Sequence, residues 1–521
     1  MHFLNVEQMR AVDRAAVAEK AIPESVLMER AGSALAETVG SVAALCGART
    51  IVAVAGHGNN GGDACVAARC LRADGFSVQV VMTCDPETLK GVAREAWARL
   101  RASGVPCRAL PAPEDWTADP EILAGSLMRR GVLIDGVLGT GCRGKPTGVA
   151  EQAIRWINRL RDRAWVVAAD LPSGMNGDTG ETLGERVRAD VTVTFARPKS
   201  CFLNAAQGAC VGHLEVADIG IPDDVCERRI ADAPCQLIAR PEIRSWLPER
   251  PYQAHKGVFG HLCVIGGSEN FRHAPVLAAL GALRSGVGLL TLAVPETSAA
   301  AAAVHVPEAM VSALPLIDSP DFGRFDAVVF GPGLSQTESA LRLTERVLER
   351  YEGKLVVDAD GLNALALLRT RGWRPREGRK LILTPHPGEA ARLLGVTVDA
   401  IQRDRLSSVR RLSEAFGAVA VLKGAGTLVC EPGGEPWLNR TGNPGMAAGG
   451  MGDVLSGVVG ALWAQGLSAE RAAAVAVWAH GTAGDCAAIR ESQASVGATA
   501  VAEQLGCVFQ MIERRGDFKQ E

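Results

Sequence analysis

Acidic residues follow three apolar, strand-like runs in the N-terminal half of the chain. The run Thr50–Ala55 leads into the segment His57–Asp63 (HGNNGGD), while Asp135 and Asp170 each end a further run before a glycine-containing turn. A carboxylate at the end of a buried strand is costly unless it is paired or binds a ligand. Because the carboxyl ends of parallel strands meet at one edge of a sheet, we expect these acidic groups to form one site.

The segment His57–Asp63 by itself admits two interpretations. Free N–H groups in a glycine turn at a helix start favour an anion. The side chains of Asn59, Asn60 and Asp63 add oxygens that suit a cation or substrate hydroxyls. The alternative is a tight turn in which an asparagine caps the helix. The dinucleotide fingerprint GxGxxG is absent, and the two strand-end carboxylates nearby favour a site.

A second motif lies in the C-terminal half, where Asn443–Asp453 (NPGMAAGGMGD) precedes the apolar run VLSGVVGALWAQG. Small residues at the positive end of a helix expose N–H groups that can bind a transferring phosphate. Asp453, in the first turn, can take a proton from an attacking hydroxyl. The alternative is a close helix–sheet packing corner with Asp453 as a helix-end charge, but the upstream GNPG favours phosphate chemistry.

Two further segments are consistent with nucleotide chemistry. Lys423–Thr427 (KGAGT) lies between two strand-like runs, as a nucleotide-binding turn would. His386 follows another strand-like run and stands between two prolines, which restrict it and make it a ligand candidate. The Walker A pattern GxxxxGK[ST] does not occur, which argues against a P-loop NTPase.

Composition restricts the class of protein. The 521 residues are enough for two to four domains, and 47% apolar with 22% charged residues is typical of a globular protein. A net charge of -3 with scattered Lys and Arg predicts neither nucleic-acid nor membrane binding. The 14 cysteines form no CxxC pair or zinc spacing, so we expect structural thiols in a reducing compartment. Without a signal-peptide pattern, the expected location is the cytoplasm.

The elements that must position these residues alternate between strand and helix. Short β-branched runs without polar alternation predict strands buried on both faces of parallel sheets. A helix over Val6–Lys20 is expected to start at an Asn5 cap supported by Gln8, and another is expected over Ala64–Asp74, closed by Gly75. The expected strands are Thr50–Ala55, Ser77–Met82, Val132–Asp135, Trp165–Asp170, Val191–Phe195, His261–Ile265, Leu289–Val294, Ala327–Phe330, Lys354–Asp358, Lys380–Thr384 and Val419–Leu422.

The strand–helix alternation lapses once, in a segment rich in proline and charge between Ile221 and Pro251. We therefore expect an N-terminal α/β domain over residues 1–225, a linker with a short helix over 226–250, and a C-terminal α/β domain over 251–521. The two halves share no motif, so no internal duplication is indicated.

The N-terminal half resembles the NAD(P)H-hydrate epimerase family. Its segments AGHGNNGGDACVAAR, IDGVLGTGCRGK and AADLPSGMNGDTG are similar to the three signature segments of that family, over about Met9 to Ile219. The resemblance implies a Rossmann-like α/β/α sandwich that interconverts the R and S epimers of NAD(P)H hydrated at nicotinamide C6. His57 and Ala64 depart from the family pattern, which usually has Pro and Gly there.

The same resemblance implies a role for each matching residue. Asp170 would be the acid/base catalyst and contact the substrate, and Asn60, Asp135 and Ser173 would bind a potassium ion. The implied substrate-binding residues are Asn59, Asn60, Gly61, Gly62, Asp63, Gly139, Thr140, Gly141, Cys142, Arg143, Gly144 and Lys145.

The C-terminal half resembles the ADP- or ATP-dependent NAD(P)H-hydrate dehydratases of the ribokinase-like superfamily. The matching segments run in family order from about His255 to Asp485: HKGVFGHLCVIGGS, GALRSGVGLLTLAVP, GPGL, DADGLNAL, LTPHPGEAARLLG, VLKGAGTLV, NPGMAAGGMGDVLSG and AHGTAGD. The resemblance implies a ribokinase-like α/β domain that phosphorylates the C6 hydroxyl of the S hydrate with ADP or ATP. Phosphate would then leave to regenerate NAD(P)H, and Mg²⁺ would accompany the nucleotide.

In this family's terms, Asp453 would be the catalytic base. Two segments depart from the pattern: Glu269–Ala274 replaces a glycine-rich run ending Gly–Ala, so that Arg272 and His273 could narrow the nicotinamide pocket, and Ser335 stands where Gly is usual. The implied site residues are Gly449, Gly450, Met451 and Gly452 for the anion hole, Lys423, Gly424, Ala425, Gly426, Thr427 and Gly452 for the nucleotide, and Ala274, Gly333, His386 and Asp453 for the hydrate.

Two alternatives remain beside a bifunctional repair enzyme. The anion hole and its aspartate would also serve a kinase for a vitamin precursor or a sugar, which would release a stable phosphorylated product. The N-terminal domain could instead be a non-catalytic binding or regulatory module, although strand-end carboxylates disfavour this. The expected ligands are NAD(P)HX and ADP or ATP, and a homo-oligomer is expected. The preferences between ADP and ATP and between NADHX and NADPHX stay open.

Overall fold

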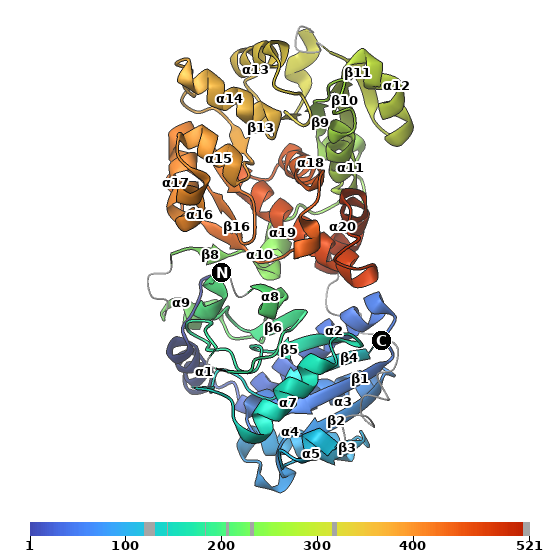
Figure 1. Cartoon of the computed structure of the whole chain (residues 1–521), viewed down its shortest axis with the longest axis vertical. Coiled ribbons are helices and arrows are strands. Elements are labelled where there is room, and N and C mark those ends of the chain that lie inside the picture. The colour runs from blue at the N-terminus through green and yellow to red at the C-terminus, as the bar shows by residue number, and fades with distance from the viewer. Residues whose placement is uncertain are drawn as a thin grey trace. The chain divides into compact units, whose positions relative to one another are not determined.

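The computed structural model describes residues 1–118, 131–142, 144–182, 184–204, 208–229, 234–314 and 320–513. The chain divides into two compact units, Met1–Ala233 and Pro234–Glu521, and each has a sheet of its own (Figure 1). Within the described ranges, none of the helices combines the length and apolar composition needed to cross a membrane. Arg143, one of the predicted substrate-binding residues, lies outside the described residues.

The first unit is built on a parallel sheet. Its described strands pair in the order β3-β2-β1-β4-β5-β6-β7, and every pairing is parallel. In a Rossmann arrangement the first strand lies inside the parallel sheet, the next two strands extend the sheet to one side, and the fourth strand pairs with the other side of the first. The observed order has this pattern and confirms the predicted Rossmann-like class. The strands are β1 (Thr50–Ala55), β2 (Ser77–Met82), β3 (Cys107–Ala109), β4 (Gly131–Gly136), β5 (Ala164–Ala169), β6 (Val191–Phe195) and β7 (His213–Ala217).

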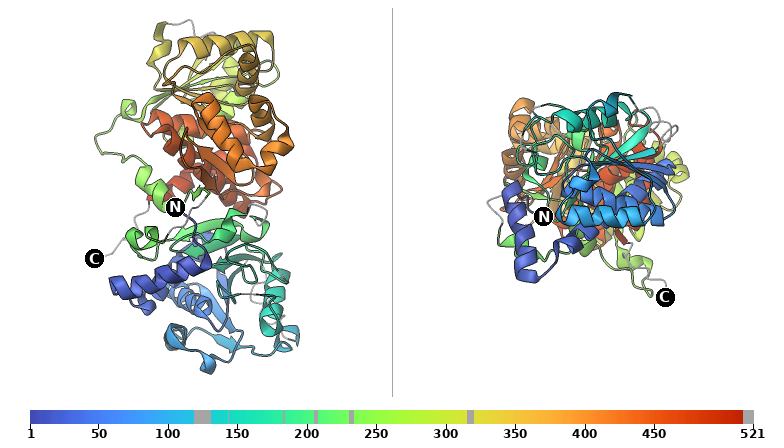
Figure 2. Two further views of the ribbon diagram at one scale, coloured as in Figure 1. Left: turned by 90° about the vertical axis from the view of Figure 1, so that its left-hand side faces the viewer. Right: turned by 90° about the horizontal axis from the view of Figure 1, so that it is seen from below.

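Helices cover both faces of this sheet, as Figure 2 shows from two further sides. Helices α2, α3 and α4 pack together on one face, and α7 packs on the other with Ile154 and Ile157 against Val52 and Leu133. The alternating sides of β1 therefore meet different helices, which is why the strand is apolar throughout. The helices are α1 (Val6–Lys20), α2 (Glu24–Cys46), α3 (Asn59–Ala73), α4 (Gly91–Ala102), α5 (Asp115–Ala118), α7 (Gly148–Arg159), α8 (Gly208–Val211) and α9 (Asp223–Glu227).

Two helix starts test the sequence predictions. Helix α1 has the predicted bounds, and its capping box is present because Asn5 accepts from the Gln8 backbone while Gln8 bonds back to Asn5. Helix α3 begins five residues earlier than predicted, at Asn59 rather than Ala64. The predicted turn NNGGD is thus the first part of the helix, because helical backbone lets Gly61 and Gly62 pack closely on their neighbours. The helix ends at Ala73, and Gly75 follows with φ 89°.

The second unit is built on a larger, mixed sheet. In the described residues the strand order is β11-β10-β9-β12-β13-β14-β15-β16-β17-β8; pairing is antiparallel on both sides of β16 and parallel elsewhere. The strands are β8 (Gln236–Leu237), β9 (His261–Ile265), β10 (Leu289–Val294), β11 (Met310–Ala313), β12 (Ala327–Phe330), β13 (Lys354–Val357), β14 (Leu381–Leu383), β15 (Val419–Leu422), β16 (Thr427–Cys430) and β17 (Trp437–Asn439).

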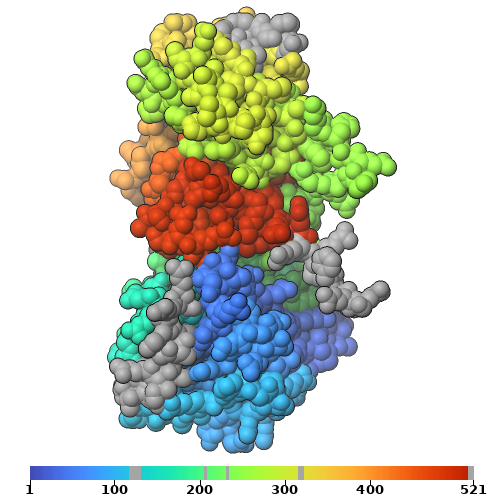
Figure 3. Space-filling model, turned by 90° about the vertical axis from the view of Figure 1, so that its right-hand side faces the viewer, coloured from blue at the N-terminus to red at the C-terminus, as the bar shows by residue number. Residues whose placement is uncertain are grey.

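Two helix layers enclose this second sheet. Helices α11, α18, α19 and α20 pack on one face, and α13, α14, α15 and α17 pack on the other. Helices α19 and α20 of the first layer belong to the C-terminal segment, whose atoms are red in Figure 3 and form a continuous surface there. Helices of this unit are α10 (Arg240–Trp246), α11 (Ala274–Arg284), α12 (Glu296–His305), α13 (Glu338–Arg350), α14 (Asp360–Thr370), α15 (Pro387–Leu394), α16 (Val398–Arg403), α17 (Arg405–Phe416), α18 (Met451–Ala464), α19 (Ala469–Arg490) and α20 (Ala498–Glu513).

Most predicted strands have the observed bounds; β13 differs by one residue at one end, and β4, β5 and β14 differ by one residue at each end. The strands β3, β7, β11 and β17 were not predicted, since they are short or carry polar side chains. The segment predicted as a linker contains β8, which pairs with β17, and α10.

Candidate active sites

The first cluster of polar groups lies where β1, β4 and β5 end. Asn60, near the start of α3, donates from Nδ2 to the Leu138 carbonyl oxygen at 2.9 Å. The Ser173 backbone N–H and hydroxyl both donate to the carboxylate of Asp135, and the Leu138 N–H donates to Ser173 Oγ at 2.8 Å. The structure therefore brings the predicted cation ligands Asn60, Asp135 and Ser173 together around Leu138.

One oxygen of this cluster lacks a partner. Asn60 Oδ1 is buried and accepts no hydrogen bond from the described residues, although buried amide oxygens are normally satisfied. Asp135 is fully buried, and this burial raises its pKa to about 6 even though Ser173 and Val137 donate to it. No cluster of three or more His, Cys, Asp or Glu side chains suited to a metal occurs in the described ranges. A cation here would thus be held by amide, hydroxyl, carbonyl and carboxylate oxygens together.

Close backbone packing fixes this cluster. A Cβ on Gly61 would lie 2.0 Å from the Gly56 carbonyl oxygen, so α3 rests directly on the end of β1. Ala64, which departs from the family pattern, faces β4, since a Cβ on Gly136 would lie 2.6 Å from Ala64 Cβ. The extra methyl of Ala64 is thus part of the helix–sheet contact.

A second group of side chains surrounds Asp170, directly after β5. Asp170 has a positive φ of 60°, a strained conformation for a residue other than glycine. Its Oδ1 accepts hydrogen bonds from Thr194 Oγ1 at 3.1 Å and from Lys199 Nζ. Sequence reasoning missed Lys199; its signal was a cation four residues after the end of β6, near the same edge of the sheet.

Asp63 adds a further buried carboxyl to this group. Burial raises its pKa well above the usual value, and repulsion from Asp170 adds to the effect.

The remaining predicted substrate-binding residues form the loop after β4 and the start of α3. Gly139 packs against Asn60, because a Cβ there would lie 3.3 Å from the Asn60 side chain. Cys142 donates its backbone N–H to the Gly139 carbonyl oxygen at 3.1 Å, which closes a tight turn. Exposed or partly exposed positions, available to a ligand, are Asn59, Thr140, Gly141, Cys142, Gly144 and Lys145.

In the second unit, the predicted anion hole lies at the start of α18. Gly450 caps this helix with φ 86°, and a Cβ there would lie 2.5 Å from the Leu277 side chain. Gly449 and Gly452 are not buried, so the N–H groups of this helix start can reach a ligand. Asp453 lies in the first turn, and burial together with repulsion from Asp358 raises its pKa to about 7.

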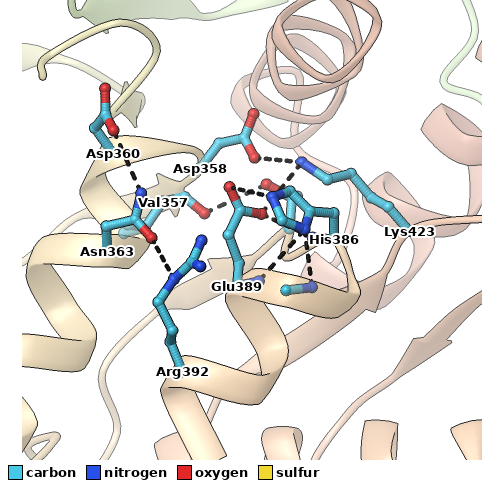
Figure 4. Close-up of polar contacts among 10 residues, drawn as sticks. Val357, Asp358, Asp360, Asn363, His386, Glu389, Arg392 and Lys423 are labelled. Atoms are coloured by element: carbon cyan, nitrogen blue, oxygen red, sulfur yellow. Dashed lines mark hydrogen bonds and ion pairs between the residues drawn. The ribbon is translucent and has the colours of Figure 1, made fainter. Parts of the chain in front are cut away.

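Beside this helix start lies a cluster formed by the buried carboxyl groups of Asp358 and Glu389 and the partly buried side chain of Lys423 (Figure 4). Lys423 Nζ donates to Asp358 Oδ1 at 2.7 Å and lies 3.9 Å from Glu389 Oε2. The other Asp358 oxygen, Oδ2, is buried and has no hydrogen-bond partner in the part of the chain that the structure describes, and it would lie 3.8 Å from a Cβ on Gly452. An unpaired carboxylate oxygen thus faces the predicted phosphate site at the start of α18.

His386 is fixed by the helix that follows it. Its Nδ1 accepts the backbone N–H of Gly388 at 2.9 Å and that of Glu389 at 3.4 Å, while Glu389 accepts the His386 N–H at 2.7 Å. Since Nδ1 is an acceptor, the proton of the neutral ring is on Nε2. Burial lowers the His386 pKa, which favours this neutral form. The ring is half exposed, and its Nε2 lies 3.4 Å from Glu389 Oε1.

The predicted nucleotide-binding turn, Lys423–Thr427, is held by a residue that sequence reasoning missed. Arg405 Nη2 donates to the carbonyl oxygens of Leu422, Lys423 and Gly426 at 3.1 to 3.2 Å. Thr427 Oγ1 donates to the Gly424 carbonyl oxygen at 2.9 Å and closes the turn.

Two predicted hydrate-binding residues, Ala274 after β9 and Gly333 after β12, lie close together. A Cβ on Gly333 would lie 3.0 Å from Ala274 Cβ and 2.7 Å from the Phe271 carbonyl oxygen, so the structure brings Gly333 and Ala274 together. Arg272 and His273 are exposed. Ser335, where the family usually has Gly, has a positive φ of 67° and donates its N–H to Asp360.

Comparison with known proteins assigns a family model to each half of the chain. Residues 262–506 match the NAD(P)H-hydrate dehydratase family model, and residues 24–201 match the model of the YjeF-related protein N-terminus. A ribokinase-like superfamily protein from Enterococcus faecalis, 24% identical, shares the fold of the second unit with a TM-score of 0.50, over 54% of this chain and 98% of that one. The class is therefore a two-domain α/β protein with a ribokinase-like C-terminal unit.

Full-length relatives identify the family. The bifunctional NAD(P)H-hydrate repair enzyme of Moorella thermoacetica is 37% identical over 98% of this chain and 97% of its own length. The enzyme of the same name from Coxiella burnetii is 38% identical over 92% of this chain and 94% of its own. The chain belongs to the family of bifunctional NAD(P)H-hydrate repair enzymes.

Proposed function

We propose that this chain repairs hydrated NAD(P)H, with epimerisation in the first unit and nucleotide-dependent dehydration in the second. The observation that carries the proposal is the start of α18, where Asp453 and the exposed N–H groups lie beside Lys423 and the unpaired oxygen of Asp358. This arrangement suits the transfer of a phosphoryl group to a hydroxyl.

Dehydration begins with Asp453 as the base. It takes the proton of the C6 hydroxyl while the hydroxyl oxygen attacks the terminal phosphorus of ADP or ATP. The bond from this phosphorus to the bridging oxygen breaks, so that AMP or ADP leaves, and the N–H groups of Gly449–Gly452 stabilise the charge on the transferring phosphoryl group. The C6–O bond then breaks, phosphate leaves, and the loss of a C5 proton restores the ring double bond. Lys423–Thr427 binds the nucleotide, and His386 donates from Nε2 to the hydrate, which also contacts Ala274 and Gly333.

Magnesium fits the second site. Asp358 Oδ2 is a hard, buried oxygen without a partner, and it faces the start of α18 near Lys423. We infer that Asp358 takes part in holding Mg²⁺, which shields the nucleotide phosphates when bound. Asp358→Asn is expected to weaken Mg²⁺–nucleotide binding at least tenfold in calorimetry and to leave metal-free nucleotide binding within about threefold. Equal losses with and without Mg²⁺ would contradict this role.

Epimerisation in the first unit requires inversion at C6. This carbon bears both the added hydroxyl and the ring nitrogen, so one of these bonds must open and re-form, and each opening moves a proton. Asp170 is the proposed acid/base group, and the hydrate lies against Asn59–Asp63 and Gly139–Lys145.

A potassium ion fits the cluster around Leu138. The buried Asn60 Oδ1 without a donor suits a hard monovalent cation, and Asp135 and Ser173 add oxygens within the same cluster. K⁺ is expected to raise the melting temperature of the wild-type first unit by more than Li⁺ at equal ionic strength. Asn60→Leu is expected to remove this difference, and an unchanged difference would contradict the ion site. Cytoplasmic location and assembly as a homo-oligomer remain predictions.

The direct test is recovery of the reduced-nicotinamide absorbance from a mixture of R and S NADHX with Mg²⁺ and either ADP or ATP. Full recovery supports both activities, and the faster nucleotide identifies the preferred donor; NADPHX in parallel identifies the preferred hydrate. Recovery of the S fraction alone would reduce the first unit to a binding module. A stable phosphorylated product without recovery would favour a small-molecule kinase.

A further inference from the structure

Lys199 is a buried cation in the first unit with no role in the reaction as described so far. Its side chain is 2% exposed. Its Nζ donates to the carboxylate of Asp170, to Thr194 Oγ1 at 2.9 Å and to the Phe195 carbonyl oxygen at 3.0 Å. An ammonium has three protons, and these three acceptors satisfy them all. Burial of a lysine is costly, and these three hydrogen bonds offset the cost of desolvating its ammonium group.

The contacts of Asp170 indicate what Lys199 does. Lys199 and Thr194 both bond Asp170 Oδ1, which leaves Oδ2 as the oxygen that can face a ligand. The Asp170 backbone is fixed as well, since its N–H donates to the Val193 carbonyl oxygen at 2.7 Å and its φ is 60°. The carboxylate is therefore restrained from both ends in one orientation.

We propose that Lys199 is a positioning residue that holds the Asp170 carboxylate through Oδ1 and so directs Oδ2 toward C6 of the bound hydrate. This inference rests on the proposed epimerase function. Lys199 acts through Asp170 and need not contact the substrate.

Other charged groups around the pair make the lysine necessary. Asp63 in α3 and Asp13 in α1 both interact electrostatically with Asp170 and with Lys199, and Glu24 and Arg14 lie close enough to act on Asp13. Carboxyl groups thus approach Asp170 from two helices. The Lys199 ammonium places a positive charge in direct contact with the Asp170 carboxylate, and loss of an opposite charge at such a contact disfavours the charged form of a carboxyl group.

The test replaces Lys199 by Met and by Gln and follows the interconversion of purified R and S NADHX by chromatography without nucleotide. Gln keeps a polar group that can form a hydrogen bond with Thr194, so the Gln variant provides the test if the Met variant does not fold. Both changes are expected to lower kcat about 100-fold and to move the acid limb of the pH profile to higher pH. Lys199→Arg, which keeps the charge, is expected to restore the position of the acid limb and part of the rate.

Thr192→Val is the matched control. Thr192 lies in β6, as Thr194 does, and it is buried, but its hydroxyl donates to the Val211 carbonyl oxygen and not to Asp170. It is expected to leave the pH profile unchanged. Dehydration of the S hydrate by the same variants reports whether the second unit is folded, and a wild-type-like thermal unfolding transition of the first unit reports that this unit is folded as well. A Lys199→Gln variant with a lower rate but an unshifted acid limb, or with the wild-type rate, would overturn the inference. Failure of the wild-type chain to interconvert the epimers would instead refute the proposed epimerase function.

Discussion

Asp453 and Glu389 are unusual carboxyl groups because their pKa values both lie near 7. Burial is the main cause for each, and Asp358 repels both, while Lys423 opposes the shifts. A catalytic base works best when its pKa lies near the operating pH, so the environment of Asp453 suits its proposed role. The protonation of the second site thus depends on the balance between repulsion among its acidic groups and their attraction to Lys423.

This gives a pH dependence for dehydration. Since the pKa of Asp453 is raised to about 7, its carboxyl is protonated at lower pH and cannot accept the hydroxyl proton. We expect kcat/KM for the S hydrate to fall about tenfold per pH unit below about pH 7 and to level off above it. Initial rates of absorbance recovery at saturating nucleotide measure this, and a flat profile through pH 6 would exclude Asp453 as the titrating base.

At the scale of the elements, the sequence predicts most of what lies close together in the chain. The apolar runs give the buried strands, and the Asn5–Gln8 pair gives the start of α1. Lys199 and Arg405 could not be found in this way. Lys199 bonds a residue 29 positions away, and Arg405 bonds carbonyl groups 17 to 21 positions away. Such contacts depend on which strands become neighbours, and no local pattern records that.

The cap of α1 can be measured on its own. Asn5→Ala is expected to lower the free energy of unfolding of the first unit by about 1 kcal/mol, because it leaves the Gln8 N–H without its acceptor. Asn5→Asp keeps an acceptor and is the control. Chemical denaturation gives both values; equal stability of the Ala variant and the wild type would show that water replaces the cap.

Arg405 gives a second prediction at this scale. Arg405→Ala is expected to raise the nucleotide KM about tenfold while changing kcat by less than about twofold, because it loosens a binding turn and leaves Asp453 in place. Arg403→Ala, an exposed neighbour at the end of α16, is the control. A loss in kcat with an unchanged KM would place Arg405 in the chemical step.

At the scale of the whole molecule, the chain joins two α/β units with separate sheets and separate sites. Their proposed reactions complement each other chemically. Hydration gives both epimers, dehydration consumes S, and epimerisation converts R to S. A single chain with both activities can therefore return the whole hydrated pool to NAD(P)H.

The most direct measurement compares Asp170→Asn and Asp453→Asn on mixed R and S NADHX with Mg²⁺ and nucleotide. Asp170→Asn is expected to recover absorbance only for the S fraction. Asp453→Asn is expected to recover none while the epimers still interconvert. Loss of both activities in either variant would contradict the assignment of one reaction to each unit, and full recovery by Asp170→Asn would refute its role in epimerisation.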